Sequence, residues 1–178
     1  MKLRKMQNLV ISALFAAIIC VATIIIKIPS PATNGYFNLG DCFVILAGFL
    51  LPPVYGMLAA GIGSALADVL SGYMQYAPAT FIIKALMAVA VYLIVRAFKG
   101  KLTFFSKIIA GFTAEAVMVL GYFAYEATVL GYGIAAAGSV LSNVMQGIVG
   151  IAAAFIIVTA INKNKALSAF FMKGNHNE

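Results

Sequence analysis

The chain has 178 residues, of which 63% are apolar and 10% are charged, and its mean hydropathy is +1.04. Soluble domains carry roughly 45–50% apolar and about 25% charged residues. The composition therefore excludes an ordinary soluble enzyme, a disordered chain and a nucleic-acid-binding protein, and it predicts an integral membrane protein. Since one helical crossing takes about 20 residues, six crossings leave only short connections and no room for a second, soluble domain.

The net charge of +7 comes from basic residues that gather between apolar stretches. Most of them lie in three clusters, at residues 2–5, 96–107 and 163–173. Lys and Arg beside membrane helices are retained on the cytoplasmic side. Because the clusters form no continuous basic face, they predict membrane orientation and not a nucleic-acid partner.

The apolar stretches predict six transmembrane helices in a single membrane domain. The helices are expected at residues 6–26, 39–51, 54–70, 79–98, 108–125 and 139–161, followed by a cytosolic tail at 162–178. The stretch from 39 to 70 is divided at Pro52-Pro53, because an unbroken helix would far exceed the hydrocarbon core. The second helix is short, so we expect its neighbours to shield it. Six crossings place all three basic clusters and both termini in the cytoplasm.

Ionisable residues inside membrane helices are candidates for function, because lipid makes them costly. In the predicted helices they are Asp41, Asp68, Lys84, Glu115 and Glu126. All but Glu115 fall near the outer ends of their helices, and most tyrosines map to the same side. Two interpretations remain open: an interfacial aromatic belt, or an outward-opening pocket for a small molecule.

Helical spacing favours the pocket. Glu115, Tyr122 and Glu126 share one face of the fifth helix, and Asn143 and Gln146 share one face of the sixth. An amide pair needs partners in lipid, so that face is expected to point into the protein. The partners are either a ligand or neighbouring helices.

Lys84 has two open interpretations at this stage. It either forms a structural salt bridge with Asp68 or contacts a ligand.

Small residues at four-residue steps mark two further helix faces. Ala13 and Ala17 form an A-x-x-x-A motif in the first helix, which permits close approach of another helix. Gly56, Ala60 and Ser64 form a similar row in the third helix. We interpret the third-helix row as internal packing and the first-helix motif as a possible external docking face.

Motifs for catalysis and metal binding are missing from the sequence. The single histidine, His176, stands in the tail, so no H-E-x-x-H motif or His-assisted nucleophile can form. No G-x-x-x-x-G-K-[ST] motif is present, so the chain has no P-loop for ATP. We therefore expect no enzymatic activity, no metal and no cofactor.

Several motifs in order along the chain resemble those of the substrate-binding S component of energy-coupling factor (ECF) vitamin transporters. They are Ala13-x-x-x-Ala17, Asn38-Leu39-Gly40-Asp41, Pro53-x-x-Gly56, Leu66-Ala67-Asp68 with Ser71-Gly72-Tyr73, Ala77-Pro78 with Lys84, and Asn143-x-x-Gln146-Gly147. The resemblance covers nearly the whole chain.

The resemblance implies a six-helix bundle in a prokaryotic plasma membrane that captures a vitamin or precursor from outside. It also implies partners, namely a transmembrane coupling subunit and two cytosolic ATPases, with Ala13 and Ala17 in the docking contact. By the same resemblance, the substrate-binding residues are Tyr36, Asn38, Lys84, Tyr122, Glu126, Asn143 and Gln146.

Within that family the pattern is most similar to groups assigned to pyridoxine or hydroxymethylpyrimidine, and next to the riboflavin group. The alternative function is a self-sufficient channel or facilitator, which needs a polar path through both leaflets. The inner half of the predicted bundle offers little beyond Glu115 for such a path.

Overall fold

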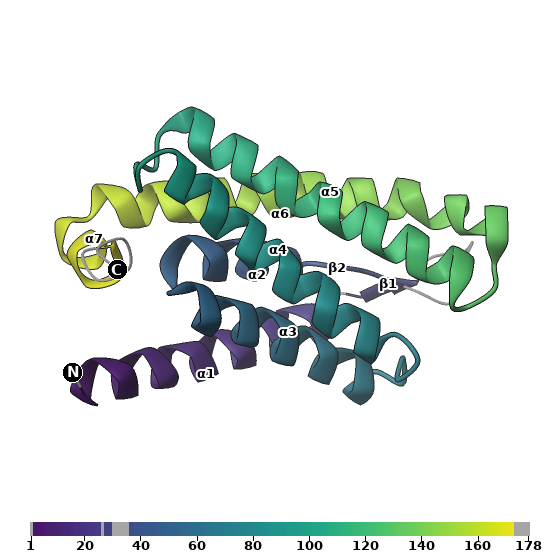
Figure 1. The fold of residues 1–178 in the computed structure, drawn as a ribbon. Coiled ribbons are helices and arrows are strands. Elements are labelled where there is room, and N and C mark those ends of the chain that lie inside the picture. The colour runs from purple at the N-terminus through teal and green to yellow at the C-terminus, as the bar shows by residue number, and fades with distance from the viewer. Residues whose placement is uncertain (1, 26, 30–35, 173–178) are drawn as a thin grey trace.

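The computed structural model describes residues 2–25, 27–29 and 36–172, nearly all of them in helices (Figure 1). The long helices are α1 (Lys2–Ile25), α3 (Pro53–Leu70), α4 (Ala77–Ala97), α5 (Phe104–Thr128) and α6 (Ala137–Lys163). Each of them contains a stretch long and apolar enough to cross a membrane, and α2 (Gly40–Leu50) is apolar but shorter. The prediction of a helical membrane bundle is confirmed.

Helix α2 forms the centre of the bundle. It contacts α1, α3, α4 and α6, and every residue of α2 except Phe43 is buried. Eleven helical residues extend only about 16 Å, roughly half of the hydrocarbon core. The surrounding helices shield this short helix, as the sequence predicts. Helix α2 ends before Pro52-Pro53, and Pro53 occupies the first turn of α3, where proline is well tolerated.

The first outer connection contains two short strands where the sequence predicts an irregular loop. Strand β1 (Lys27–Pro29) pairs antiparallel with β2 (Tyr36–Asn38), so that Lys27 lies opposite Asn38. Prolines in this segment favour a loop, but the three residues of each strand are enough to form an antiparallel pair of strands. Strand β2 ends at Asn38, two residues before α2 begins at Gly40.

The C-terminal segment also differs from the predicted tail. Helix α6 extends to Lys163, and a further helix, α7 (Lys165–Met172), follows. The side-chain oxygen of Asn164 accepts hydrogen bonds from the N–H groups of Ala166, at 3.0 Å, and Leu167, at 3.2 Å. Asn at a helix start satisfies otherwise unpaired N–H groups, which explains why a new helix begins here. A short 3₁₀ helix, η1 (Gly133–Ala136), precedes α6.

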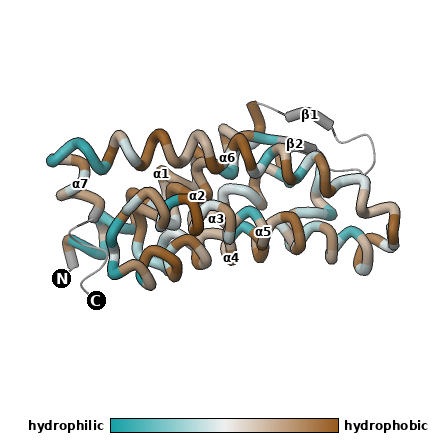
Figure 2. The backbone as a smooth tube through the Cα atoms, turned by 90° about the horizontal axis from the view of Figure 1, so that it is seen from above, coloured by the Kyte–Doolittle hydropathy of each residue, from teal (hydrophilic) through white to brown (hydrophobic). Residues whose placement is uncertain are grey.

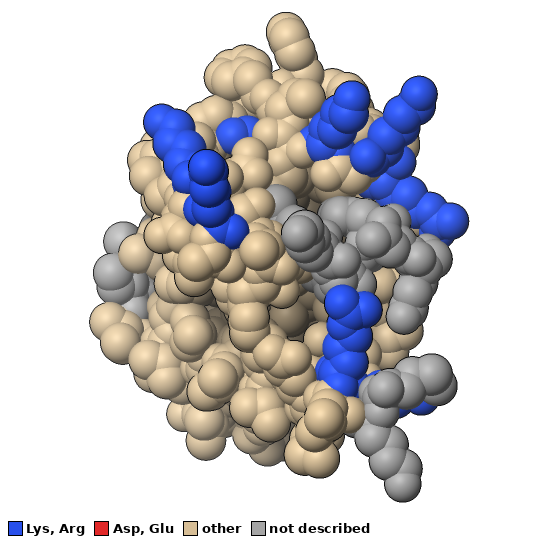
Figure 3. All heavy atoms as spheres, turned by 90° about the vertical axis from the view of Figure 1, so that its left-hand side faces the viewer, with Lys and Arg blue, Asp and Glu red and all other residues tan. Residues whose placement is uncertain are grey.

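Charge and hydropathy distinguish the two ends of the bundle. The start of α1, the connection from α4 to α5 and the end of α6 meet at the left of Figure 1, where α7 also lies. Several Lys and Arg side chains project from this end, and no Asp or Glu is visible on it (Figure 3). Figure 2 shows hydrophobic residues along the long helices and hydrophilic residues at this basic end, with further hydrophilic residues toward the opposite end. That this end faces the cytoplasm stays a prediction of the positive-inside rule.

Glycines bring neighbouring helix backbones close together. A Cβ atom at Gly63 of α3 would lie 2.5 Å from the carbonyl oxygen of Ala16 in α1, and one at Gly56 would lie 2.9 Å from that of Ala47 in α2. Ala60 and Ser64 are buried on the same helix. The predicted internal packing of this row of small residues in α3 is confirmed.

We predict that Gly63→Ala destabilises the protein, because its Cβ would press on the α1 backbone. Overpacking of this kind costs roughly 1–3 kcal/mol. Thermal unfolding in detergent is the measurement, and Gly111→Ala is the matched control. A Cβ at Gly111 meets only the side chain of Ile151, at 3.1 Å, which can shift. Equal melting temperatures for the two variants would contradict the prediction.

Candidate ligand-binding site

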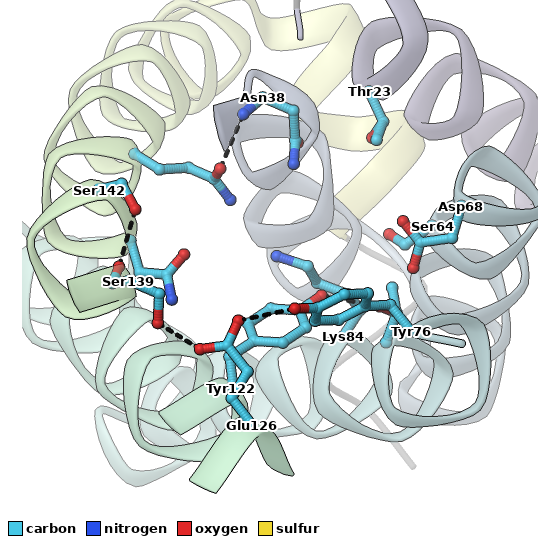
Figure 4. Close-up of a pocket in the computed structure, with 13 residues that line it drawn as sticks. Thr23, Asn38, Ser64, Asp68, Tyr76, Lys84, Tyr122, Glu126, Ser139 and Ser142 are labelled. Carbon is cyan, nitrogen blue, oxygen red and sulfur yellow. Dashed lines mark hydrogen bonds between the residues drawn. The ribbon is translucent and has the colours of Figure 1, made fainter. Parts of the chain in front are cut away.

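A pocket of about 540 Å³, counting its open mouth, lies at the end of the bundle opposite the basic residues (Figure 4). The pocket is lined by polar and aromatic residues from six elements and the α3–α4 loop: Thr23, Asn38, Ser64, Asp68, Tyr76, Thr80, Lys84, Tyr122, Glu126, Ser139, Ser142, Asn143 and Gln146. The ends of helices that are distant in sequence thus form one site.

The pocket floor contains Lys84 of α4, whose ammonium group forms an ion pair with Asp41 of α2. Both side chains are almost completely buried, and Asp41 stands in the first turn of α2. The partial positive charge of a helix N-terminus favours a carboxylate at this position. Lys84 also lies 5.5 Å from the centre of the Tyr122 ring, within the range of a cation–π contact.

Gln146 connects this floor to the first outer connection. Its Nε2 donates to Asp41 Oδ2 at 2.6 Å, and its Oε1 accepts from the backbone N–H of Asn38 at 2.7 Å. The side-chain oxygen of Asn38 in turn accepts from the N–H of Gly40 at 2.8 Å. Gln146 therefore links α6, α2 and β2, and most of its hydrogen-bonding capacity is used inside the protein.

Tyrosines form one wall of the pocket. The rings of Tyr76 and Tyr122 are tilted with centres 6.4 Å apart, and Tyr76 and Tyr125 are 5.9 Å apart. The Tyr122 hydroxyl is 3.0 Å from Thr80 Oγ1. Such tilted pairs are favourable aromatic contacts, and they present ring surface to the cavity.

Glu126 lies between the tyrosines and α6. Its carboxylate accepts from the Tyr76 hydroxyl at 3.0 Å and from the Ser139 hydroxyl. The side chain is only 2% exposed. Glu126 thereby connects α5 to the α3–α4 loop and to the start of α6.

The opposite wall carries hydroxyl groups and a second carboxylate. Thr23 of α1 and Ser64 and Asp68 of α3 lie together on this side, facing the cavity (Figure 4). All three are buried. Asn143, on the α6 wall, is half-buried and makes no side-chain hydrogen bond within the described residues, so its amide is available to a ligand.

The structure brings together six of the seven residues predicted for the site, namely Asn38, Lys84, Tyr122, Glu126, Asn143 and Gln146. The side chain of Tyr36 lies outside the described residues. Glu115, predicted on the same face as Tyr122, does not line the pocket. It is buried deeper against Gly147 and Gly150, and within the described residues its carboxyl oxygens have no hydrogen-bond partner.

Sequence reasoning missed several residues of the site. It considered only Asp68 as a partner of Lys84 and did not consider Asp41, although Asp41 directly follows the Asn38-Leu39-Gly40 motif. Pairing of Lys84 with Asp68 stays a prediction. Ser64 stands four residues before Asp68, and Ser139 and Ser142 stand seven and four residues before Gln146, so helical spacing was the available signal. For Thr23, helical spacing in the sequence did not point to the site.

The fold and the pocket together define a multi-pass membrane protein with a polar pocket at one end. A family model described as "ECF-type riboflavin transporter, S component" matches residues 3–163. The chain belongs to this family, and an S component is the substrate-binding subunit of an ECF transporter. The chain is also 37% identical over 134 residues to an uncharacterized protein of Pyrococcus woesei, with 75% of this chain and 86% of that protein covered.

We predict that Gln146→Ala and Asn143→Ala, which each remove a side-chain amide from α6, differ in their effect on stability. Gln146→Ala removes the partner of both Asp41 and the Asn38 N–H, so it lowers stability by roughly 1–3 kcal/mol per buried group left unpaired. Asn143→Ala breaks no hydrogen bond of the described residues and leaves the melting temperature unchanged. Thermal unfolding without ligand measures both. A larger loss of stability in Asn143→Ala than in Gln146→Ala would contradict the hydrogen-bond network.

Proposed function

We propose that this protein captures a small heteroaromatic vitamin or vitamin precursor from outside the cell for import by an ECF transporter. One observation carries this proposal: a polar pocket with a tyrosine wall lies at the end of the bundle opposite the basic clusters. Flat rings pack well against tyrosine, and the amide and hydroxyl groups around the wall offer partners for ring nitrogens and hydroxyls. Family membership supports the same role.

The substrate we propose is pyridoxine or hydroxymethylpyrimidine, with riboflavin next. The name of the matched family supports riboflavin. The ring would lie against Tyr122, and Asn143, Lys84 and Glu126 would bind its polar substituents. We assign Gln146 and Asn38 to holding the connection between α1 and α2 in place, because Gln146 binds the Asn38 N–H and Asp41, and Asn38 binds the N–H of Gly40 at the start of α2.

Packing below the pocket disfavours a channel. Under the Asp41–Lys84 pair the core contains the buried Glu115, and beyond it apolar side chains that include Met87, Val91 and Val158, each fully buried. A channel needs polar groups along its whole length, because ions and polar solutes lose hydration in an apolar constriction. A pocket closed at its floor fits capture and not unassisted passage.

Binding to purified protein tests the proposal. Thermal-shift screening and calorimetry with B vitamins and their precursors should identify one compound that binds in a 1:1 ratio. We expect Asn143→Ala to weaken that binding by about tenfold or more, because a ligand group would lose its partner. Ser168→Ala, on α7 at the other end, should retain the wild-type affinity. Absence of binding to every compound would overturn the proposed function.

A second prediction concerns the partner subunits. Ala13 and Ala17 are exposed on α1, beside exposed Leu14 and Ile18, so this face is uncovered in the described bundle. We propose that the coupling subunit packs there, and that two ATPases energise the assembly. Ala17→Leu places a bulky side chain at a close helix contact. It should abolish co-purification of the coupling subunit and leave ligand affinity unchanged, and Ala152→Leu, the same change at an exposed position of α6, serves as the control. Retained co-purification would exclude this face.

A further inference from the structure

The basic end of the bundle carries positive charge that no described carboxylate offsets. The acidic residues in the described part of the chain, Asp41, Asp68, Glu115 and Glu126, line the pocket or lie below it. Several Lys and Arg side chains project from the basic end, and the described residues there include no Asp or Glu (Figure 3). A surface of one sign attracts a partner of the opposite sign.

Lys107, near the start of α5, differs from the other described lysines of this end because it is buried. Its side chain is 7% exposed. The ammonium group donates to the Thr159 hydroxyl at 2.6 Å and lies 4.4 Å from the centre of the Phe155 ring. Both partners are neutral, and a buried charge is costly unless an opposite charge accompanies it. An anion bound here would therefore remove part of that cost.

Helix α6 places a second ammonium group beside Lys107. Phe155, Thr159 and Lys163 follow one another at four-residue steps, so they share one face of α6. Lys163 is exposed in the last turn of α6, and it is close enough for its charge to act on Lys107. Two ammonium groups repel each other, and an anion that contacts both replaces this repulsion by attraction.

An apolar surface of α5 continues from this pair of lysines into the membrane-spanning part of the helix. Phe105, Ile109 and Phe112 share one face of α5 and are 69%, 41% and 62% exposed. Phe104 is exposed as well, and its ring packs edge-on against Phe155 at 5.5 Å. A small anion in solution gains nothing from this surface, whereas the acyl chains of a lipid pack on it. The two features together favour a phospholipid over free phosphate.

We propose that Lys107 and Lys163 bind the phosphate group of an anionic phospholipid, whose acyl chains lie along the exposed apolar face of α5. Basic residues between membrane helices on the cytoplasmic side are suited to anionic headgroups. The site lies at the opposite end of the bundle from the pocket, so it does not depend on the proposed capture function.

Native mass spectrometry of the purified full chain, titrated with lipid, tests the inference. Phosphatidylglycerol and phosphatidylcholine with identical acyl chains differ in the net charge of the headgroup. We expect one molecule of phosphatidylglycerol to bind about tenfold tighter than phosphatidylcholine, and glycerol phosphate, which has no acyl chains, to bind far more weakly than either lipid. Equal affinity for the two lipids would overturn the anionic site. Binding of glycerol phosphate as tight as that of phosphatidylglycerol would overturn the lipid as its occupant.

Three variants locate the site. Lys107→Gln and Lys163→Gln each remove one positive charge, so each should weaken binding of phosphatidylglycerol about fivefold and change that of phosphatidylcholine by less than about twofold. Lys5→Gln is the matched control, because it removes the same charge from an exposed position of α1, a helix that packs on α2 and α3. It should retain the affinity of the unaltered protein.

The exposed Lys163 keeps the test decisive even where Lys107→Gln does not fold, which melting temperatures verify. Unchanged affinity for phosphatidylglycerol in folded Lys163→Gln would exclude the site. An equal loss in Lys5→Gln would show general attraction to the whole basic end and would also overturn it.

Discussion

The buried ion pair between Asp41 and Lys84 determines how the pocket is built. It joins the short central helix to α4, and Gln146 extends the connection to α6 and to the first outer strand pair. Burying two paired charges gains little net stability, because the cost of desolvation offsets much of their attraction. Removing one of the two residues is strongly destabilising, because the other charge is then buried without a partner. The pair therefore fixes the relative positions of α2, α4 and α6 more than it strengthens the bundle.

The shortness of α2 explains why a cavity exists at this end at all. A helix that crossed the whole bundle would fill the space above Asp41. Instead α2 begins at Gly40, where a Cβ atom would come within 2.1 Å of the Thr23 hydroxyl oxygen. Asn38, two residues before α2, lines the pocket, and its N–H donates to Gln146. One glycine and one short helix thus leave room for a ligand within an otherwise apolar core.

A bundle of apolar helices with basic residues at one end was predictable because lipid imposes simple rules on length, hydropathy and charge. Six of the site residues were predictable because helical spacing and the family motifs point to them. The ion pair between Asp41 and Lys84 was not predictable, because spacing within one helix does not show which residues of different helices face each other. The same holds for Thr23, which joins the site only through the packing of α1 on α3. The helix α7 depends on the local cap at Asn164, a single-residue signal inside a polar segment.

A pocket with a closed floor has a consequence for transport. Below Asp41 and Lys84 the bundle is packed with apolar side chains, so a bound ligand cannot move toward the basic end without rearrangement of the core or reorientation of the whole subunit. Rearranging a close-packed interior sacrifices many contacts at once. Reorientation of the whole subunit leaves the interior contacts intact and requires only that the lipid-facing surface is apolar. Helix α1 has such a surface, with exposed apolar side chains and the small residues Ala13 and Ala17. The packed core therefore favours movement of the bundle as a unit over passage of a ligand through its interior.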